Sequence, residues 1–350
     1  MTIVNVFYAF CANPVRYQRL GLERRPPSLR IAIVSALAWF GLASCSQPAD
    51  PGTAYVPELF DGERLLQITR TLSADEMMGR RAGTPGNAAA RVGLTLDMAR
   101  IGLAMVGDSY DHPFTYGPMD GDGPDRPGAN LIGSIKGNGN TGQAMVVTAH
   151  YDHLGERDGE IYNGADDNAS GVAVALAIAE FFMARPPEND IYIVLLDAEE
   201  DGLGGALAFV ADPPLPREDI AINLNLDMVS KSAAGELYAV GTYHNPVLVP
   251  FVERVAEVAP VTLLMGHDRP EDGDQDWTLL SDHAVFHRLG IPFLYLGVED
   301  HAEYHQPTDV FETIPTDFYL AAADTAILIA DALDEELATL FPTQFRETNE

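Results

Sequence analysis

The sequence predicts an α/β protein, a three-layer α/β/α sandwich around a mainly parallel mixed sheet, in one domain. The first observation is that apolar runs of strand length alternate with helical segments through the second half of the chain. The second is that acidic residues and histidines follow the ends of these apolar runs. The third is the composition, because 350 residues with 47% hydrophobic and 21% charged side chains are typical of a large globular core.

The first 45 residues differ from the rest of the chain. Several arginines precede the apolar run 31–42, which is too short to span a bilayer and is typical of the core of an export signal. The run ends in Leu42-Ala43-Ser44-Cys45, which resembles a bacterial lipobox. This resemblance implies a signal peptide over 1–44, acylation of Cys45 and a lipid anchor to the membrane of the cell envelope. A plain secretory signal, which would release a secreted protein, is the alternative.

Cysteine usage agrees with this interpretation. Cys11 would leave with the signal, so Cys45 would be the last cysteine of the mature chain and no internal disulfide could form. The polar, turn-rich residues 45–56 are suited to a tether, and we expect the catalytic domain over 57–345.

Charge excludes some partners. With 52 acidic and 21 basic residues the formal net charge is -31, which would repel nucleic acid and anionic lipid headgroups. We therefore expect no nucleic acid partner.

The N-terminal part of the domain has a helical pattern over 56–107. Ser73 and Glu76 resemble a capping box, and Thr84 followed by Pro85 predicts another helix start. A loop rich in Gly, Pro and Asp follows, and then a strand at 130–135 is expected.

The second half of the chain predicts the sheet and its covering helices. We expect strands at 144–149, 190–197, 221–228, 235–241 and 291–297. We expect helices at 168–185, 202–212, 246–259, 282–290 and 317–340. In such folds sites form outside the carboxyl ends of the strands.

Candidate metal ligands lie at these strand ends. They are His150, the pair Asp166 and Asp167, the pair Glu199 and Glu200, Asp227, and His305. Imidazole and carboxylate ligands suit zinc, although cobalt and manganese can share them, and two histidines with several acids suit two ions better than one. His153 and His283 are left open between site and structural roles, and His301 is expected to be incidental. The acidic loop 267–277 leaves calcium binding open.

Five motifs carry a resemblance to a known family. "AHYDH", "GADDNASG", "LLDAEE", "NLDM" and "YHQPTD" occur in this order between Asn130 and Pro315. Together they resemble the zinc-dependent exopeptidase family of secreted bacterial aminopeptidases, whose relatives include glutamate carboxypeptidase and glutaminyl cyclase. The resemblance implies two zinc ions and peptide substrates.

The resemblance also implies roles for single residues. His150 and Asp227 would hold one zinc, Glu200 and His305 the other, and Asp166 would bridge both. Glu199 would be the general base, Asp152 would orient His150, and Tyr304 is a candidate donor to the oxyanion. The peptide bond between Asp166 and Asp167 is expected to be cis.

An aminopeptidase is the expected activity. A carboxypeptidase needs a cation for the terminal carboxylate of its substrate, and an acidic pocket suits a free α-ammonium group better. Basic side chains after His150 are few: Arg157, Arg185, Arg217, Lys231, Arg254, Arg269, Arg288 and Arg346.

Three alternatives stay open on the same fold. They are a glutaminyl cyclase-like enzyme with one zinc, a carboxypeptidase, and a non-catalytic binding domain. No Gly-x-Ser-x-Gly elbow and no phosphate-binding glycine loop occur in the sequence, which counts against a serine hydrolase or an NTPase.

Overall fold

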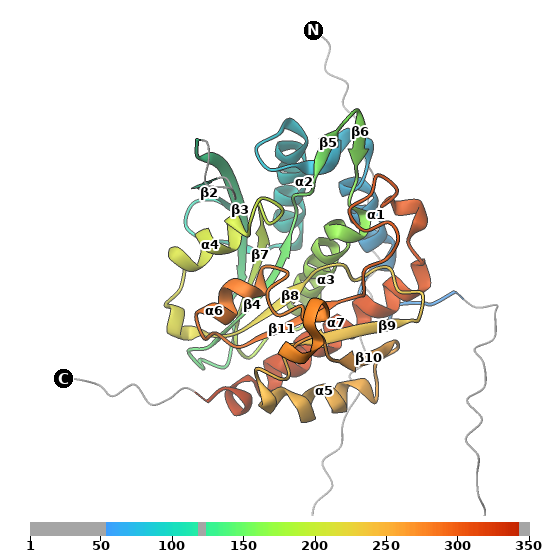
Figure 1. The fold of residues 1–350 in the computed structure, drawn as a ribbon. Helices are drawn as coiled ribbons and strands as arrows, with labels where there is room; N and C mark the ends of the chain where they lie inside the picture. The colour runs from blue at the N-terminus through green and yellow to red at the C-terminus, as the bar shows by residue number, and fades with distance from the viewer. Residues whose placement is uncertain (1–53, 118–123, 343–350) are drawn as a thin grey trace, which may run out of the picture. The chain divides into compact units, whose positions relative to one another are not determined.

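A computed structural model describes residues 54–117 and 124–342. The expected signal peptide, Cys45 and most of the expected tether lie outside the described residues. A nine-stranded sheet runs through the structure in the order β1-β3-β7-β4-β8-β11-β9-β10, with β2 paired to β3 (Figure 1). The strands are β1 (Ala104–Met105), β2 (Asp111–Tyr116), β3 (Arg126–Ile135), β4 (Ala144–His150), β7 (Asp190–Leu196), β8 (Ile220–Leu226), β9 (Glu236–Val240), β10 (Thr262–Met265) and β11 (Phe293–Gly297).

The middle of the sheet is parallel. β7, β4, β8 and β11 are neighbours in this order and all run the same way, whereas β3 joins β7, and β9 joins β11, in antiparallel pairing. The four parallel strands therefore end at one edge, where His150 and Leu196 are paired in register. The predicted mixed α/β sheet is confirmed, and this edge is the place where a site is expected.

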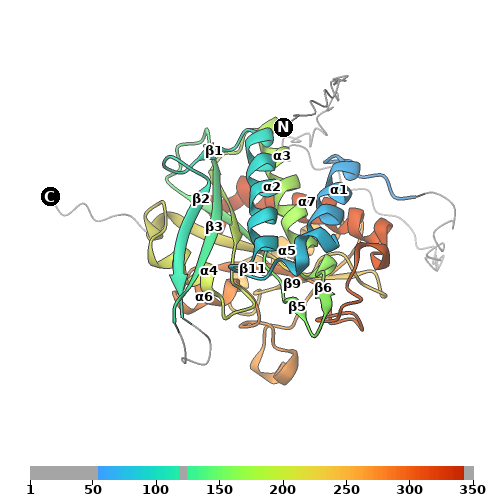
Figure 2. The same ribbon diagram turned by 90° about the horizontal axis from the view of Figure 1, so that it is seen from above.

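Helices cover both faces of the sheet. One face packs against α1 (Gly62–Leu72), α2 (Pro85–Ile101), α3 (Gly171–Ala184), α5 (Val249–Ala256) and α7 (Thr316–Leu340), several of which lie side by side in Figure 2. The other face packs against α4 (Gly204–Ala211) and α6 (His283–Arg288). Alternation along β4 explains the layers, because Met145 and Val147 point into the larger core while Val146 points into the smaller one.

The central helix α3 is almost entirely buried, which explains its apolar sequence on every side. Residues 165–184 are the one segment of the described chain that is long and apolar enough to cross a membrane, and 78% of its apolar window is buried inside the protein. In this structure it is the core helix. The segment begins with an irregular turn, Ala165–Ser170, which carries the two adjacent aspartates and leads into α3.

Helix boundaries test the expected caps. Thr84 accepts a hydrogen bond from the Asn87 N–H with Pro85 in the first turn, as predicted. The capping box expected at Ser73 was wrong. Ser73 ends α1 and donates its hydroxyl to the Thr69 carbonyl, because the chain turns there into a short 3-10 helix at Asp75–Arg80.

Short elements escaped the sequence analysis. They are β1, β2 and β10 at the sheet edges, a separate hairpin of β5 (Gly155–Arg157) and β6 (Glu160–Tyr162), and the 3-10 turns Arg217–Asp219, Pro246–Leu248, Pro270–Gln275 and Phe311–Thr313. Strands of two to four residues, such as β1, β5, β6 and β10, are too short to show an alternating pattern. The six residues of β2 include Pro113, which is uncommon inside strands.

Two glycines of α2 offer a matched test of the packing between α2 and the preceding 3-10 turn. A Cβ at Gly86 would lie 1.9 Å from the Met77 carbonyl oxygen, whereas a Cβ at Gly93 would meet nothing within 4 Å. We expect Gly86→Ala to lower the free energy of unfolding by about 2–3 kcal/mol through steric overlap. Gly93→Ala should raise it by about 0.5–1 kcal/mol, since alanine has the higher helix propensity. Urea unfolding of both variants measures the difference, and equal effects would contradict the described contact.

Candidate metal centre

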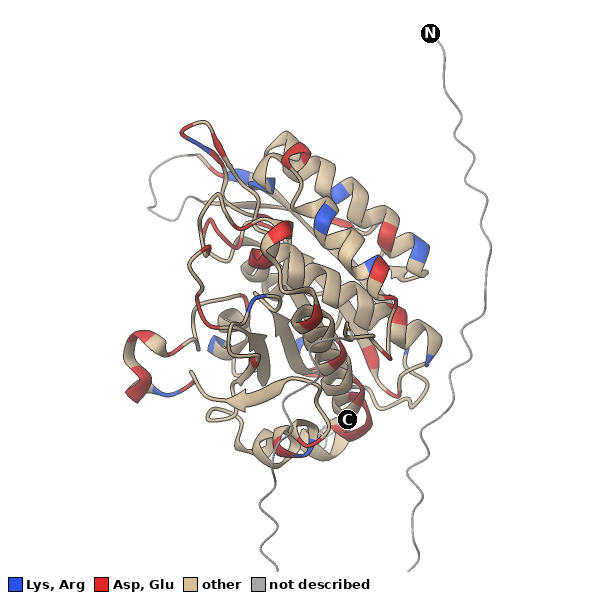
Figure 3. Cartoon of the chain, turned by 90° about the vertical axis from the view of Figure 1, so that its right-hand side faces the viewer, with Lys and Arg blue, Asp and Glu red and all other residues tan. Residues whose placement is uncertain are grey.

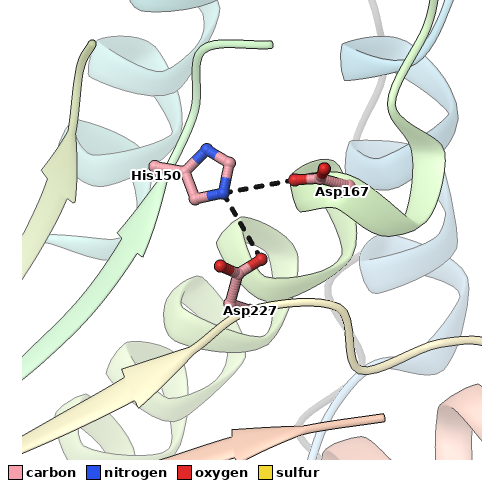
Figure 4. A group of neighbouring side chains, drawn as sticks. All are labelled: His150, Asp167 and Asp227. Carbon is pink, nitrogen blue, oxygen red and sulfur yellow. Dashed lines mark hydrogen bonds and ion pairs between the residues drawn. The ribbon is translucent and has the colours of Figure 1, made fainter. Parts of the chain in front are cut away.

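Three buried side chains from separate elements meet at the carboxyl edge of the sheet (Figure 4). His150 ends β4, Asp227 follows β8, and Asp167 comes from the turn before α3. His150 Nε2 lies 3.3 Å from an oxygen of Asp167 and 3.3 Å from an oxygen of Asp227. One imidazole and two carboxylates therefore converge within coordinating reach of a single cation.

A second group shares Asp167. The other oxygen of Asp167 lies 3.1 Å from His305 Nε2, which in turn lies 3.5 Å from Glu200. His153 joins this group, with Nδ1 2.7 Å from Glu200 and 3.7 Å from Asp167. The carboxylate of Asp167 thus lies between two sets of potential ligands, with one oxygen toward each.

The structure corrects the choice between the adjacent aspartates. Asp166, expected to bridge, accepts hydrogen bonds of 2.7 Å from both the main-chain N–H and the hydroxyl of Ser230. His301 Nε2, expected to be incidental, lies 2.9 Å from its other oxygen. Asp166 therefore does not belong to either group of candidate ligands, and Asp167 takes its place. The cis peptide bond likewise joins Asp167 to Asn168, one residue later than expected.

The main chain at this turn is held by a buried ion pair. The Asp309 carboxylate accepts hydrogen bonds from the N–H groups of Asp166 and Asp167, at 3.0–3.1 Å. Lys231 Nζ lies 2.7 Å from Asp309 and 2.6 Å from the Thr313 hydroxyl. Both charged side chains are buried. This pair fixes the backbone from which the Asp167 side chain extends.

Arg80 connects the loops on the other side of the centre. Its guanidinium is fully buried and donates to the carbonyls of Tyr151, Asn163 and Gly164, as well as to that of Leu72. Burial lowers the pKa of Arg80 to about 10, while nearby carboxylates including Asp167 oppose that shift. The side chain therefore remains charged at neutral pH and joins the loop after His150 to the loop before Asp167.

The expected catalytic side chains also lie at this edge. Glu199, Tyr304 and His305 line the same cavity as His150 and Asp167, and the cavity has a volume of about 460 Å³. The Asp152 carboxylate accepts the main-chain N–H of Glu199 at 3.0 Å and that of Glu200 at 3.4 Å. His150 Nδ1 lies 3.2 Å from the main-chain oxygen of Asp152 and 3.7 Å from its carboxylate.

Mutual repulsion and burial shift the acids of the centre in different directions. Burial and the carboxylates of Asp282, Glu200 and Asp227 raise the pKa of Glu199 well above its usual value, against an opposing effect of His150. Burial also acts to raise the pKa of Glu200, but contacts with His153 and His305 lower it to about 2. Glu199 is thus the carboxyl of the Glu-Glu pair that holds a proton more readily.

Two further buried groups near the centre have strongly shifted pKa values. Asp282 is fully buried, neither of its carboxylate oxygens forms a hydrogen bond with the residues that the structure describes, and burial raises its pKa to about 8. His283 stacks against both Phe293 and Tyr295, and burial lowers its pKa to about 3. Of the two roles left open for His283, the structural role fits, because His283 packs against aromatic rings and does not line the cavity.

The residues present fit divalent cations. Both ring nitrogens of His153 and Glu200 Oε1 are buried atoms that form no hydrogen bond with the described residues, although Nδ1 and Oε1 lie 2.7 Å apart. Buried polar atoms rarely remain without partners, and imidazole nitrogens beside carboxylate oxygens are the ligands that zinc prefers.

Among the described residues, the acidic loop 267–277 forms no comparable group. Its Asp268 instead accepts the N–H groups of Gly241 and Tyr243.

Comparison with known proteins assigns the family. The model of Peptidase family M28 matches residues 130–330, which include every candidate ligand. The chain belongs to peptidase family M28. Aminopeptidase YwaD of Bacillus subtilis is 31% identical over 191 residues, 51% of this chain and 39% of that protein. A vacuolar membrane protease of Schizophyllum commune is 25% identical over 57% of this chain and 22% of its own length. The chain thus spans less than half the length of these curated M28 relatives.

Solved structures share the M28 fold at low sequence identity. A zinc aminopeptidase from Bacillus subtilis matches with a TM-score of 0.64 and 18% identity, over 78% of this chain and 95% of the other. Glutaminyl cyclase from Porphyromonas gingivalis matches with a TM-score of 0.64 and 20% identity, over 78% and 99%. These structures confirm the expected single α/β architecture.

The buried pair of Lys231 and Asp309 can be tested against a surface pair. Lys231→Met leaves a buried carboxylate without its cation, so we expect the free energy of unfolding to fall by about 3–5 kcal/mol. Lys136→Met removes a cation whose side chain is 78% exposed beside Asp190, and the change should stay below about 1 kcal/mol. Both variants are compared by urea unfolding in the presence of chelator. Similar losses from the two would refute the structural role given to Lys231.

Proposed function

We propose that this chain is a metal-dependent aminopeptidase with two zinc ions. The observation that carries the proposal is the position of Asp167, whose two oxygens face separate groups of imidazole and carboxylate ligands. A carboxylate shared in this way is what a pair of ions roughly 3.5–4 Å apart requires. Cobalt or manganese would suit the same ligands.

The proposed ligands follow from the two groups. His150, Asp167 and Asp227 would hold one ion, and Asp167, Glu200 and His305 would hold the other. His305 is preferred to His153 because it lines the cavity and its Nε2 faces both carboxylates, whereas His153 is fully buried and does not line the cavity. His153 would then position the Glu200 carboxylate, which lies 2.7 Å from His153 Nδ1.

The proposed reaction is hydrolysis of the first peptide bond. When bound, two ions would supply Lewis acidity for the carbonyl and would lower the pKa of a water molecule. Glu199 accepts a proton as the water oxygen attacks the carbonyl carbon, and it returns the proton to the amine nitrogen as the C–N bond breaks. The Tyr304 hydroxyl, whose pKa is raised by burial and by nearby carboxylates, stays protonated and donates to the oxyanion. Asp152 positions the main chain of Glu199 and Glu200.

The cavity lining supports a peptide with a free N-terminus. Asp300, which has no part in holding the proposed ions, provides negative charge for an α-ammonium group. Apolar side chains, among them Trp277 and Leu280, provide a surface for the N-terminal side chain. The proposed compartment is the cell envelope, with Cys45 as a lipid anchor, or the exterior if the protein is secreted.

Metal content tests the bridging role of Asp167 directly. Purified protein with zinc supplied should hold two ions per chain by elemental analysis. We expect Asp167→Asn to lose both ions to below half occupancy, because the neutral amide cannot bridge two cations. Asp166→Asn is the matched control, since its carboxylate bonds to Ser230 and His301 instead.

The alternatives give other results in the same experiment. One zinc per wild-type chain would favour the alternative of a glutaminyl cyclase-like enzyme. The Porphyromonas gingivalis glutaminyl cyclase has the same fold. Loss of zinc in Asp166→Asn with retention in Asp167→Asn would restore the assignment first made from the sequence.

Catalysis by Glu199 is tested by removing its basicity without changing its size. We expect Glu199→Gln to lower kcat on an aminoacyl substrate by about 10²–10⁴-fold, because the amide cannot accept a proton. Zinc content should stay the same, which distinguishes this variant from one that loses its ions. A rate near that of the wild type would exclude Glu199 as the base.

A further inference from the structure

Arg288 is an unusual cation in this acidic chain. In residues 54–117 and 124–342, the other lysine and arginine side chains all pair with a carboxylate, donate to a carbonyl or lie over an aromatic ring. Arg288 has no hydrogen bond, no ion pair and no ring contact in the same part of the chain. It nevertheless lines the cavity of the candidate metal centre.

The position of Arg288 at the end of α6 does not account for it. The carbonyls of this helix end are already satisfied by main-chain groups, since Leu289 and Ile291 donate to Phe286 and Gly290 donates to His287. The guanidinium is therefore not needed to cap the helix. It is an exposed, unpaired donor at a cavity whose other charged side chains apart from His150 and His305 are all acidic.

An unpaired guanidinium in such a place suits a carboxylate. Arginine binds carboxylates through two parallel hydrogen bonds, and it does so most effectively where water is partly excluded. Asp300 lines the same cavity and, within residues 54–117 and 124–342, forms no ion pair with Arg288 or with any other side chain. The cavity thus presents separated, unpaired charges of both signs together with the proposed ions.

We propose that Arg288 binds the α-carboxylate of a short peptide, so that the enzyme acts preferentially on dipeptides. The inference rests on the proposed aminopeptidase function and specifies its substrate. In a dipeptide the carboxylate lies one residue beyond the scissile bond, and both charged ends fit a single cavity of about 460 Å³, within the usual range of ligand pockets. In a longer peptide the chain continues past Arg288 and the pairing is lost.

The experiment compares leucyl-alanine, its C-terminal amide and its N-acetyl derivative, using the full chain with zinc. We expect wild-type kcat/KM to be at least tenfold higher for the free acid than for the amide. In Arg288→Gln this ratio should fall to near one, and Arg288→Lys should keep part of it, since the charge remains but the fork geometry does not. Arg269→Gln is the matched control, because Arg269 lies over Tyr243 and does not line the cavity.

A binding measurement separates recognition from turnover. In the Glu199→Gln background, calorimetric titration with leucyl-alanine should give an affinity at least tenfold higher than titration with the amide, and adding Arg288→Gln should remove the difference. Circular dichroism checks that the exposed substitution leaves the fold intact.

Several outcomes would overturn the inference. A wild-type ratio of one, an Arg288→Gln ratio equal to that of the wild type, or equal rates on leucyl-alanine and a leucyl hexapeptide would each do so. A preference for glutamyl-alanine amide that disappears in Arg288→Gln would mean that Arg288 binds an acidic side chain instead. Cleavage of the N-acetyl peptide, or of none of the peptides, would refute the aminopeptidase proposal itself, whereas equal cleavage of acid and amide refutes only the role of Arg288.

Discussion

The ion pair of Lys231 and Asp309 is the interaction on which the geometry of the centre depends. Lys231 lies four residues after Asp227, and Asp309 lies four residues after His305, so the pair joins two segments that each bring a candidate ligand. Asp309 also accepts the N–H groups of the turn that presents Asp167. A buried charge pair is costly to desolvate, and here that cost is offset by hydrogen bonds that fix three separate segments relative to one another.

Charge concentrated in a small volume is the second constraint. Carboxylates converge at one edge of the sheet in a chain that already has a formal net charge of -31. Segments of acidic residues, red in Figure 3, are spread over the helices and loops. Arg80 and Lys231 are two buried cations close to these acids: Lys231 pairs with Asp309, and Arg80 lies within electrostatic reach of Asp167 and Asp152. These cations are bonded to main-chain oxygens and to Asp309, so they moderate the repulsion without occupying the positions of the proposed ions.

Much of this arrangement could be predicted from the sequence, because apolar runs followed by acids or histidines indicate strand ends. The order of motifs predicted the fold, and His150, Glu200, Asp227 and His305 do meet at one edge. The choice between Asp166 and Asp167 could not be predicted, since adjacent side chains point in different directions and only the irregular turn decides which faces inward. His153 was likewise undecided, although the second histidine of "AHYDH" was a usable signal.

The segment before the family match contributes to the centre through Arg80. This residue lies 50 positions upstream of the first residue that the family model covers, yet its donors occupy carbonyls on both loops beside the candidate ligands. Asn87 likewise reaches Asp197, at the end of β7. Cleavage of the chain between these residues and β3 would leave all five motifs intact and still weaken their alignment, so the part of the chain that positions the candidate ligands is longer than the family match.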